Sequence, residues 1–103
     1  VPLATAVIVN PTHYAVALKY DMNAPGAPRV VAKGKNYLAL RIRQKAIDNQ
    51  VPLIENPPLA QALYKSVDVG REIPAELYRA VAEVLAYVYQ LQGKELPKLL
   101  KAA

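Results

Sequence analysis

Two short apolar runs, residues 3–9 and 14–20, lie near the start of the chain with only four residues between them. Both are rich in β-branched or aromatic side chains and are bounded by turn-forming residues, which predicts two β-strands. The first run is almost continuously apolar, a pattern typical of a strand that is covered on both faces. A chain that begins in this way is expected to build a sheet with helices packed against it.

Turn-forming residues divide the rest of the chain into further short elements. Residues 21–28 include two Pro, one Gly and one Asn, and they are predicted to form a surface loop. A third strand is expected over residues 29–33, ended by Gly34, and a brief fourth strand is expected over residues 53–55, just after Pro52.

Two helices are predicted between residues 36 and 66. Asn36 is expected to cap the first helix, which runs to about residue 49. Helical spacing predicts an inward set, namely Leu38, Ile42, Lys45, Ala46 and Asn49, and a set toward water, namely Arg41, Arg43 and Gln44. Pro57 and Pro58 suit the first turn of a second, shorter helix that ends at about Ser66.

The last and longest helix is expected to begin at Pro74 and to end before Gly93 and Pro97. One broad apolar stripe follows its length, made of Leu77, Val81, Val84, Leu85 and Val88. The Lys-rich residues 93–103 are expected to be a frayed tail. The predicted fold class is therefore α/β, with a small mixed four-stranded sheet and about three to four helices in a single domain over residues 1–103.

Composition excludes several classes of site. The 103 residues suffice for one domain with a single core. The chain has no Cys and only one His, which excludes disulfide scaffolds, thiolate metal sites, Cys nucleophiles and paired His ligands. It also lacks a glycine-rich phosphate loop, so we expect no cofactor and no bound metal. No apolar run approaches the roughly 18 residues that a membrane span needs.

The net charge of +5 allows an anionic partner, either nucleic acid or an acidic lipid surface. The Lys and Arg residues are scattered along the sequence, without the interleaved aromatic residues of a nucleic-acid platform. We therefore expect no nucleic-acid partner, and a basic nucleic-acid-binding module stays as an alternative that steep salt dependence of DNA binding would support. A hydrolase is a third class, although only one Ser or Thr hydroxyl, that of Thr12, adjoins the single His in sequence.

The most specific feature is the tetrapeptide Asn10-Pro11-Thr12-His13 between the first two strands. Its simplest interpretation is an ordinary β-turn, with Asn at the first position and Pro at the second. A second interpretation is chemical. An Asn side-chain amide can attack its own backbone carbonyl, closing a five-membered succinimide and breaking the peptide bond that follows.

Proline favours this cleavage over its usual competitor. The competing reaction is deamidation, in which the next backbone nitrogen attacks the Asn side chain, and Pro11 closes that route because it has no N–H. Its nitrogen also belongs to a tertiary amide, which a tight turn can twist from planarity and so weaken. Cleavage still needs proton transfer and donors for the developing oxyanion.

His13 and Thr12 are the candidates for that assistance. An imidazole is the side chain that ordinarily titrates near neutral pH, so His13 acts either as a proton-transfer group or as a donor that holds the turn. A second Asn-Pro bond, Asn56-Pro57, has no neighbouring hydroxyl or imidazole and serves as an internal control. The hypothesis predicts a cut after Asn10 and none after Asn56, as a single-turnover reaction and not as enzyme turnover.

Beyond the tetrapeptide, the chain resembles the self-cleaving cytoplasmic domain of the flagellar type III export switch proteins, the FlhB family, and its relatives in virulence secretion systems. The matching blocks follow in the family's order: residues 14–21, 27–34, 40–43, 51–53, 57–60, 63–64, 73–78 and 80–89. The resemblance spans roughly residues 3–92. The Val-Ala-Lys-Gly block and the last helix favour the flagellar branch over the virulence branch. Gln44, Asn56 and Tyr87 depart from the family's usual residues, but none of them lies in the tetrapeptide.

The resemblance implies a cytoplasmic module of a bacterial inner-membrane protein, whose N-terminal transmembrane bundle and linker are absent from this sequence. It implies that cleavage between Asn10 and Pro11 precedes a change of export from rod and hook subunits to filament subunits, in response to a hook-length control protein. Those subunits, that protein and other export components are the partners that it implies. The equivalent domain of a virulence system is the alternative.

The resemblance also implies a patch that binds export substrates. The matching positions are Ala27 and Pro28, in the loop before the third strand, and Ala82 and Leu85, on the last helix. Both helix positions can equally lie on the apolar stripe that packs into the core, so this assignment and plain core packing are alternatives.

Overall fold

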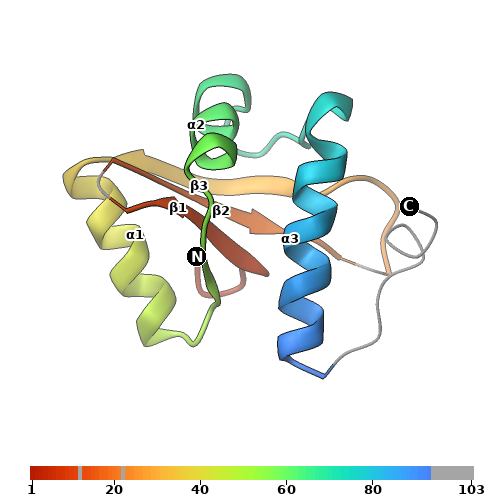
Figure 1. Cartoon of the computed structure of the whole chain (residues 1–103), viewed down its shortest axis with the longest axis horizontal. Coiled ribbons are helices and arrows are strands. Elements are labelled where there is room, and N and C mark those ends of the chain that lie inside the picture. The colour runs from red at the N-terminus through yellow and green to blue at the C-terminus, as the bar shows by residue number, and fades with distance from the viewer. Residues whose placement is uncertain (12, 22, 94–103) are drawn as a thin grey trace.

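The computed structural model describes residues 1–11, 13–21 and 23–93, so the predicted tail beyond Gly93 lies outside the described residues. Its centre is a four-stranded mixed sheet in the order β3-β2-β1-β4 (Figure 1). The strands are β1 (Ala6–Asn10), β2 (Tyr14–Lys19), β3 (Arg29–Lys35) and β4 (Leu53–Glu55). The β1–β2 and β2–β3 pairs are antiparallel, and β4 runs parallel to β1. The first strand of the chain is therefore an inner strand of the sheet.

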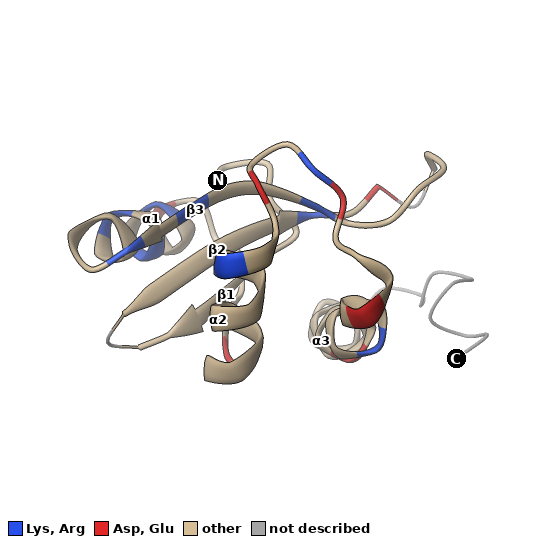
Figure 2. Ribbon diagram, turned by 90° about the horizontal axis from the view of Figure 1, so that it is seen from above, with Lys and Arg blue, Asp and Glu red and all other residues tan. Residues whose placement is uncertain are grey.

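Three α-helices cover the two faces of this sheet. α1 (Tyr37–Asp48) packs on one face, while α2 (Pro57–Ser66) and α3 (Tyr78–Leu91) pack on the other. Figure 2 shows the sheet lying between α1 and the other two helices. A short 3-10 turn, Ala75–Leu77, leads into α3. The predicted α/β class, with a mixed four-stranded sheet, is confirmed, and β4 and α2 have the bounds expected from their flanking Pro residues.

The predicted burial of the first strand on both faces is also confirmed. Ala6 and Ile8 belong to the core cluster under α2 and α3, whereas Val7 and Val9 belong to the cluster under α1. Each of these four side chains is buried. Burying one side chain of this size stabilises the fold by about 1.5–3 kcal/mol, so β1 is held from both sides.

Gly34 does not end the third strand as expected. β3 continues through it to Lys35, with Gly34 paired to Ala15. A Cβ placed on Gly34 would lie 2.5 Å from Cγ of Leu38, in the first turn of α1. The glycine thus allows the strand and the helix to approach closely and does not form a turn. Composition alone does not distinguish these two uses of glycine.

The ends and faces of two helices also differ from the expectation. Asn36 does precede α1, but its φ of 55° is left-handed and its side chain makes no capping hydrogen bond. The buried residues of α1 are Ala39, Ile42 and Ala46. Of the other residues expected to face inward, Leu38 is half exposed, and Lys45 and Asn49 are exposed. α3 begins at Tyr78, because Pro74 is extended and the 3-10 turn intervenes.

Candidate functional site

The tetrapeptide forms the loop of the β1–β2 hairpin. Asn10 pairs with Tyr14 at the end of the antiparallel ladder, so three residues connect the two strands. Asn10 is half-buried, and Pro11 and His13 are exposed. The loop therefore projects from two strands whose remaining residues are anchored in the core.

A hydrogen bond closes this loop at the predicted cleavage point. The backbone N–H of His13 donates to the carbonyl oxygen of Asn10, with 3.1 Å between nitrogen and oxygen. That oxygen belongs to the peptide bond between Asn10 and Pro11. A donor already directed at this oxygen is the arrangement that stabilises negative charge when a carbonyl is attacked.

Two further hydrogen bonds hold the loop against the β3–α1 junction. The backbone N–H of Asn36 donates to the carbonyl of His13 at 2.8 Å. From α1, Nη1 of Arg43 donates to the carbonyl of Pro11 at 3.0 Å. Arg43 was expected to face water, but it is half-buried because its guanidinium reaches back over the hairpin.

The first residue after the loop is held by aromatic packing. The rings of Tyr14 and Tyr64 lie with their centroids 4.9 Å apart. Nζ of Lys33 lies 5.2 Å from the centroid of Tyr64 and donates to the carbonyls of Tyr64 and Val67, each at 2.9 Å. These contacts join the start of β2, and the neighbouring strand β3, to the end of α2.

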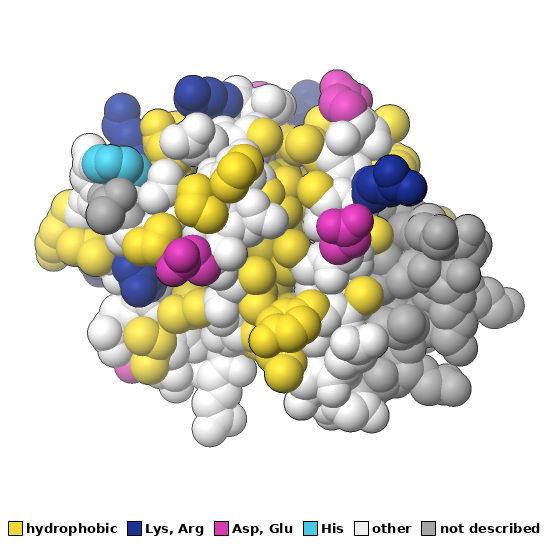
Figure 3. Space-filling model, in the orientation of Figure 1, with side chains coloured by type: hydrophobic (Ala, Val, Ile, Leu, Met, Phe, Trp, Pro, Cys, Tyr) yellow, Lys and Arg dark blue, Asp and Glu magenta, His cyan; other side chains and the backbone are white. Residues whose placement is uncertain are grey.

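The structure brings Asn10, Pro11 and His13 together, and Thr12 lies outside the described residues. His13 takes part through its backbone, since both its N–H and its carbonyl are hydrogen-bonded. Its imidazole is exposed and meets the ring of Tyr14 edge-on, with the centroids 6.3 Å apart. In Figure 3 the His side chain (cyan) lies at the molecular surface. The hydrogen bonds that hold the loop at His13 are backbone bonds, and the role of this residue as a proton-transfer group or as a turn-holding donor stays a prediction.

The second Asn-Pro bond has a different environment. Asn56 precedes α2 as its N-cap, and its side-chain oxygen accepts a hydrogen bond from the N–H of Leu59 at 3.3 Å. The backbone carbonyl of Asn56 accepts the first helical bond, from the N–H of Ala60 at 2.9 Å. The two Asn-Pro bonds thus occupy a hairpin loop and a helix start.

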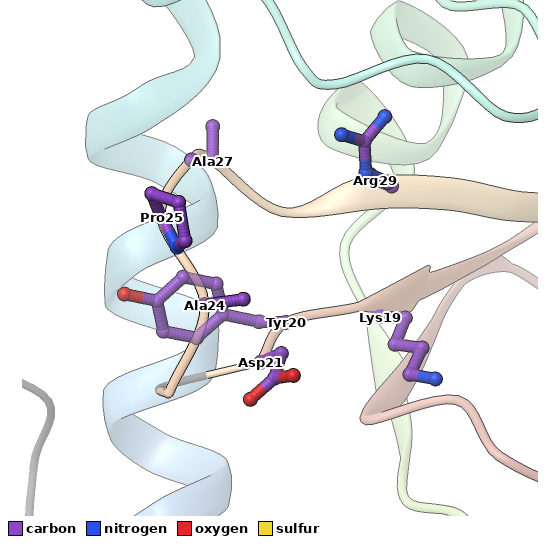
Figure 4. A pocket seen from close by; sticks show the side chains of 8 residues that line it. Lys19, Tyr20, Asp21, Ala24, Pro25, Ala27 and Arg29 are labelled. Atoms are coloured by element: carbon purple, nitrogen blue, oxygen red, sulfur yellow. The ribbon is translucent and has the colours of Figure 1, made fainter.

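The four predicted patch residues divide between two neighbouring cavities. Pro28, Ala82 and Leu85 line an apolar hollow of about 10 Å³, which has room for at most one water molecule. Ala27 lines a more polar cavity of about 240 Å³ at the loop before β3, and Tyr20 lines both cavities. Figure 4 shows Tyr20 beneath this loop and beside α3. Leu85 is only 2% exposed, so it also packs in the core as the alternative expected.

Burial raises the pKa of Tyr89, on α3, and the nearby groups of Tyr20 and Asp21 raise it further.

Within the described part of the chain, no three His, Cys, Asp or Glu side chains are placed to hold a metal ion. No helix in the same part has the length and apolarity that crossing a bilayer requires. Figure 2 shows the Lys and Arg positions spread over several elements, a distribution that does not favour the nucleic-acid alternative.

The sequence of this chain is similar to those of known proteins. The model of the "FlhB HrpN YscU SpaS Family" matches residues 1–88. The chain belongs to this family. It is 56% identical over 92 residues to the flagellar biosynthetic protein FlhB of Escherichia coli K12, a match that covers 89% of this chain. The chain spans about a quarter of the length of that curated relative, because the match covers 24% of it.

Solved structures of FlhB-family domains have the same fold. The cytoplasmic domain of FlhB from Shewanella putrefaciens superposes with a TM-score of 0.84 at 45% identity, over 88% of this chain and 70% of that one. A mutated EscU C-terminal domain carrying an Asn-to-Ala substitution gives a TM-score of 0.81 at 32% identity, over 84% of this chain and 87% of that one. The α/β arrangement described above is therefore the fold of the FlhB cytoplasmic domain.

Sequence reasoning missed two residues of the candidate site, Asn36 and Arg43. Neither is near the tetrapeptide in sequence, and the pattern of α1 placed Arg43 among the water-facing residues. The helical period does carry a weak signal, because Arg43 follows Ala39 by four residues and precedes Ala46 by three, on the edge of the buried face.

Proposed function

We propose that this chain is the cytoplasmic switch module of a flagellar type III export component and that it cuts itself between Asn10 and Pro11. The observation that carries the proposal is the hydrogen bond from the N–H of His13 to the Asn10 carbonyl, at 3.1 Å. It places an oxyanion donor on the one carbonyl that succinimide formation attacks. Higher identity to the flagellar relative, 56%, than to the EscU domain, 32%, favours the flagellar branch.

The reaction proceeds in two steps. The side-chain nitrogen of Asn10 forms a bond to the backbone carbonyl carbon of the same residue, and the negative charge on the oxygen is stabilised by the N–H of His13. The bond to Pro11 then breaks; the attacking amide gives up one proton, and water delivers one proton to the Pro11 nitrogen. The products are a succinimide at the end of residues 1–10 and a secondary amine at Pro11. Water later opens the ring.

The two products are expected to stay associated. β1 lies between β2 and β4 and is buried on both faces, so residues 1–10 keep these contacts after the bond is cut. The loop gains freedom while the core is preserved. The cut thus changes the surface around the hairpin, which is the change that a specificity switch requires.

Mass spectrometry under denaturing conditions tests the cleavage directly. The chain should give two products, residues 1–10 and residues 11–103, whereas native chromatography should give a single species. A chain that is folded by circular dichroism and yet stays whole after prolonged incubation would contradict the proposal.

We further propose that the patch at Ala27, Pro28, Ala82 and Leu85 binds a short apolar segment of an export subunit. The hollow lined by the last three is apolar but too small for a side chain as it stands. Binding therefore requires the hollow to widen, and Tyr20 is the proposed moving residue because it lines both this hollow and the larger cavity beside Ala27. Rod, hook and filament subunits are the proposed partners, with a hook-length control protein and other export components acting on the same module.

A pair of variants on α3 tests this patch. Ala82→Arg fills the hollow with a charged side chain and should weaken the binding of labelled subunit segments about tenfold or more. Gln90→Arg adds the same charge at an exposed position of the same helix and should leave binding unchanged. Equal binding by both variants would show that the hollow is not the docking site.

A further inference from the structure

We infer that Arg43 is a positioning residue for the cleavage: its guanidinium holds the Pro11 carbonyl and so keeps the loop in the turn that directs the N–H of His13 at the Asn10 carbonyl. This inference rests on the self-cleavage proposed above. Nη1 of Arg43 lies 3.0 Å from the Pro11 oxygen, across 32 residues of sequence. The Arg43 side chain comes from α1, an element packed on the face of the sheet opposite to α2 and α3.

The hydrogen bond from Arg43 to the Pro11 carbonyl acts on the one backbone angle of Pro11 that is free to rotate, ψ. The pyrrolidine ring already restricts φ. A hydrogen bond to the carbonyl restricts ψ, because the direction of the carbonyl is set by that dihedral angle. With both angles restricted, the chain leaves Pro11 in one direction, and this keeps the N–H of His13 on the Asn10 carbonyl. The orientation of this peptide unit also decides the type of a β-turn.

Among the contacts given for residues 10, 11 and 13, it is Arg43 that reaches the Pro11 carbonyl. The N–H of His13 holds the Asn10 carbonyl, and the N–H of Asn36 holds the His13 carbonyl. Both are backbone donors that no side-chain substitution at their own position removes, except Pro. Arg43 is thus the side chain through which α1 acts on the loop, and its effect can be removed without altering the backbone donors.

The structure also explains why the helix side is firm enough for this role. α1 is anchored by Ala39, Ile42 and Ala46 in the core, and Ile42 directly precedes Arg43. Arg43 itself is half-buried, so part of its side chain is held by packing. A planar guanidinium on a fixed helix loses less freedom on bonding than a flexible ammonium does.

The first experiment compares cleavage rates of matched variants of the 103-residue chain. Each chain is made by cell-free synthesis, and the appearance of residues 11–103 is followed on denaturing gels. Arg43→Met, which keeps length but loses the donor, should cleave about 10- to 100-fold more slowly, since small misplacements of reacting groups cost rates of this size. Arg43→Lys, which keeps a donor of similar reach, should recover most of the rate.

Arg41→Met is the control, because it removes the same charge from the same helix. Arg41 is exposed and lines a shallow hollow with Val1 and Leu38, away from the hairpin loop. It should cleave at the parent rate. Equal slowing in the Arg41 and Arg43 variants would reduce the effect to net charge and overturn the inference, as would an Arg43→Met chain that cleaves at the parent rate.

A second measurement does not depend on cleavage. In chains that carry Asn10→Ala, amide hydrogen exchange at His13 reports the order of the loop in the folded state. Adding Arg43→Met should speed exchange of this amide several-fold while amides in the core of β2 keep their protection. Unchanged exchange at His13 would overturn the inference even if cleavage itself is observed, and a parent chain that never cleaves would overturn both proposals.

Discussion

The side-chain oxygen of Asn56 accepts a hydrogen bond from the N–H of Leu59, and this bond commits the second Asn-Pro sequence to beginning a helix. The carbonyl of Asn56 is likewise committed to the first helical bond. At Asn10 the carbonyl instead lies in a hairpin loop and faces the N–H of His13. The same dipeptide thus has two local structures: both carbonyls accept a backbone N–H, and the side chain of Asn56 serves in addition as a helix cap.

The first prediction uses this contrast. Asn10→Ala should leave one intact chain, because the Asn amide is the nucleophile of the reaction. Asn56→Ala should still be cut after Asn10 while losing about 0.5–2 kcal/mol of stability through the missing helix cap. Denaturing mass spectrometry and urea unfolding measure the two effects. Efficient cleavage of the Asn10→Ala chain would exclude the succinimide route.

The second prediction separates the backbone of His13 from its imidazole. His13→Pro should abolish cleavage, because proline lacks the N–H that points at the Asn10 carbonyl. His13→Ala keeps that N–H and should retain the rate within about tenfold, below the 10²–10⁴-fold that proton transfer usually contributes. Rates followed from pH 5 to 9 complete the test. A hundredfold loss in His13→Ala, together with a parent rate that titrates as an imidazole does, would assign the ring a proton-transfer role.

The third prediction concerns Pro11. Pro11→Ala should slow cleavage, because the new N–H admits deamidation as a competing reaction and releases the restricted φ. Peptide mapping should then find uncut chains in which Asn10 is converted to Asp or isoaspartate. A Pro11→Ala chain that cleaves as fast as its parent, with no deamidated product, would show that neither effect of proline matters.

The fourth prediction tests the retention of the short product. Ile8 is fully buried in the cluster under α2 and α3. Ile8→Ala should lower the free energy of unfolding by about 2–5 kcal/mol and should let residues 1–10 separate from the cleaved domain. Native gel filtration followed by mass analysis detects the loss. Leu3→Ala, at a residue that is 79% exposed, is the matched control and should change neither quantity.

The fifth prediction follows from the raised pKa of Tyr89. The folded chain favours the neutral phenol, and the pKa of this group lies above its ordinary value of about 10 in the unfolded chain. The stabilisation is therefore complete below pH 10 and is lost as the pH rises through and beyond that value. Tyr89→Phe should weaken this alkaline loss in urea unfolding at pH 8 to 11. An identical pH profile in the variant would show that Tyr89 does not contribute.

The parts of the fold that could be predicted are those decided by local chemistry. β4 and α2 have their expected bounds because Pro52, Pro57 and Pro58 restrict the backbone conformation at their own positions. The burial of β1 on both faces could be predicted because its side chains from Ala6 to Val9 are all apolar. Tertiary contacts decided the rest. Gly34 lies within a strand, at a point that α1 approaches closely. A glycine in the sequence alone does not show whether it belongs to such a contact or to a turn.

The candidate site divides in the same way. The tetrapeptide is contiguous, so its chemistry could be argued from four letters. The donors that hold it are the N–H of Asn36 and the guanidinium of Arg43, which reach the loop only through the placement of α1. The left-handed backbone of Asn36, with φ of 55°, sets that placement, and no local pattern in the sequence predicted it.

The inner position of β1 has a mechanical consequence. Any chain joined ahead of Val1 is connected to residues 11–93 by the covalent backbone at Asn10, and a tension along the chain is carried by that bond. Once the bond is cut, the same tension must pass through β1 alone, as shear against β2 and β4. Strands pulled along their length share the load over all their backbone hydrogen bonds at once. A cleaved domain would therefore resist small forces and release residues 1–10 abruptly above a threshold, whereas in an uncut domain the two parts stay joined by the backbone even after the contacts of β1 have broken.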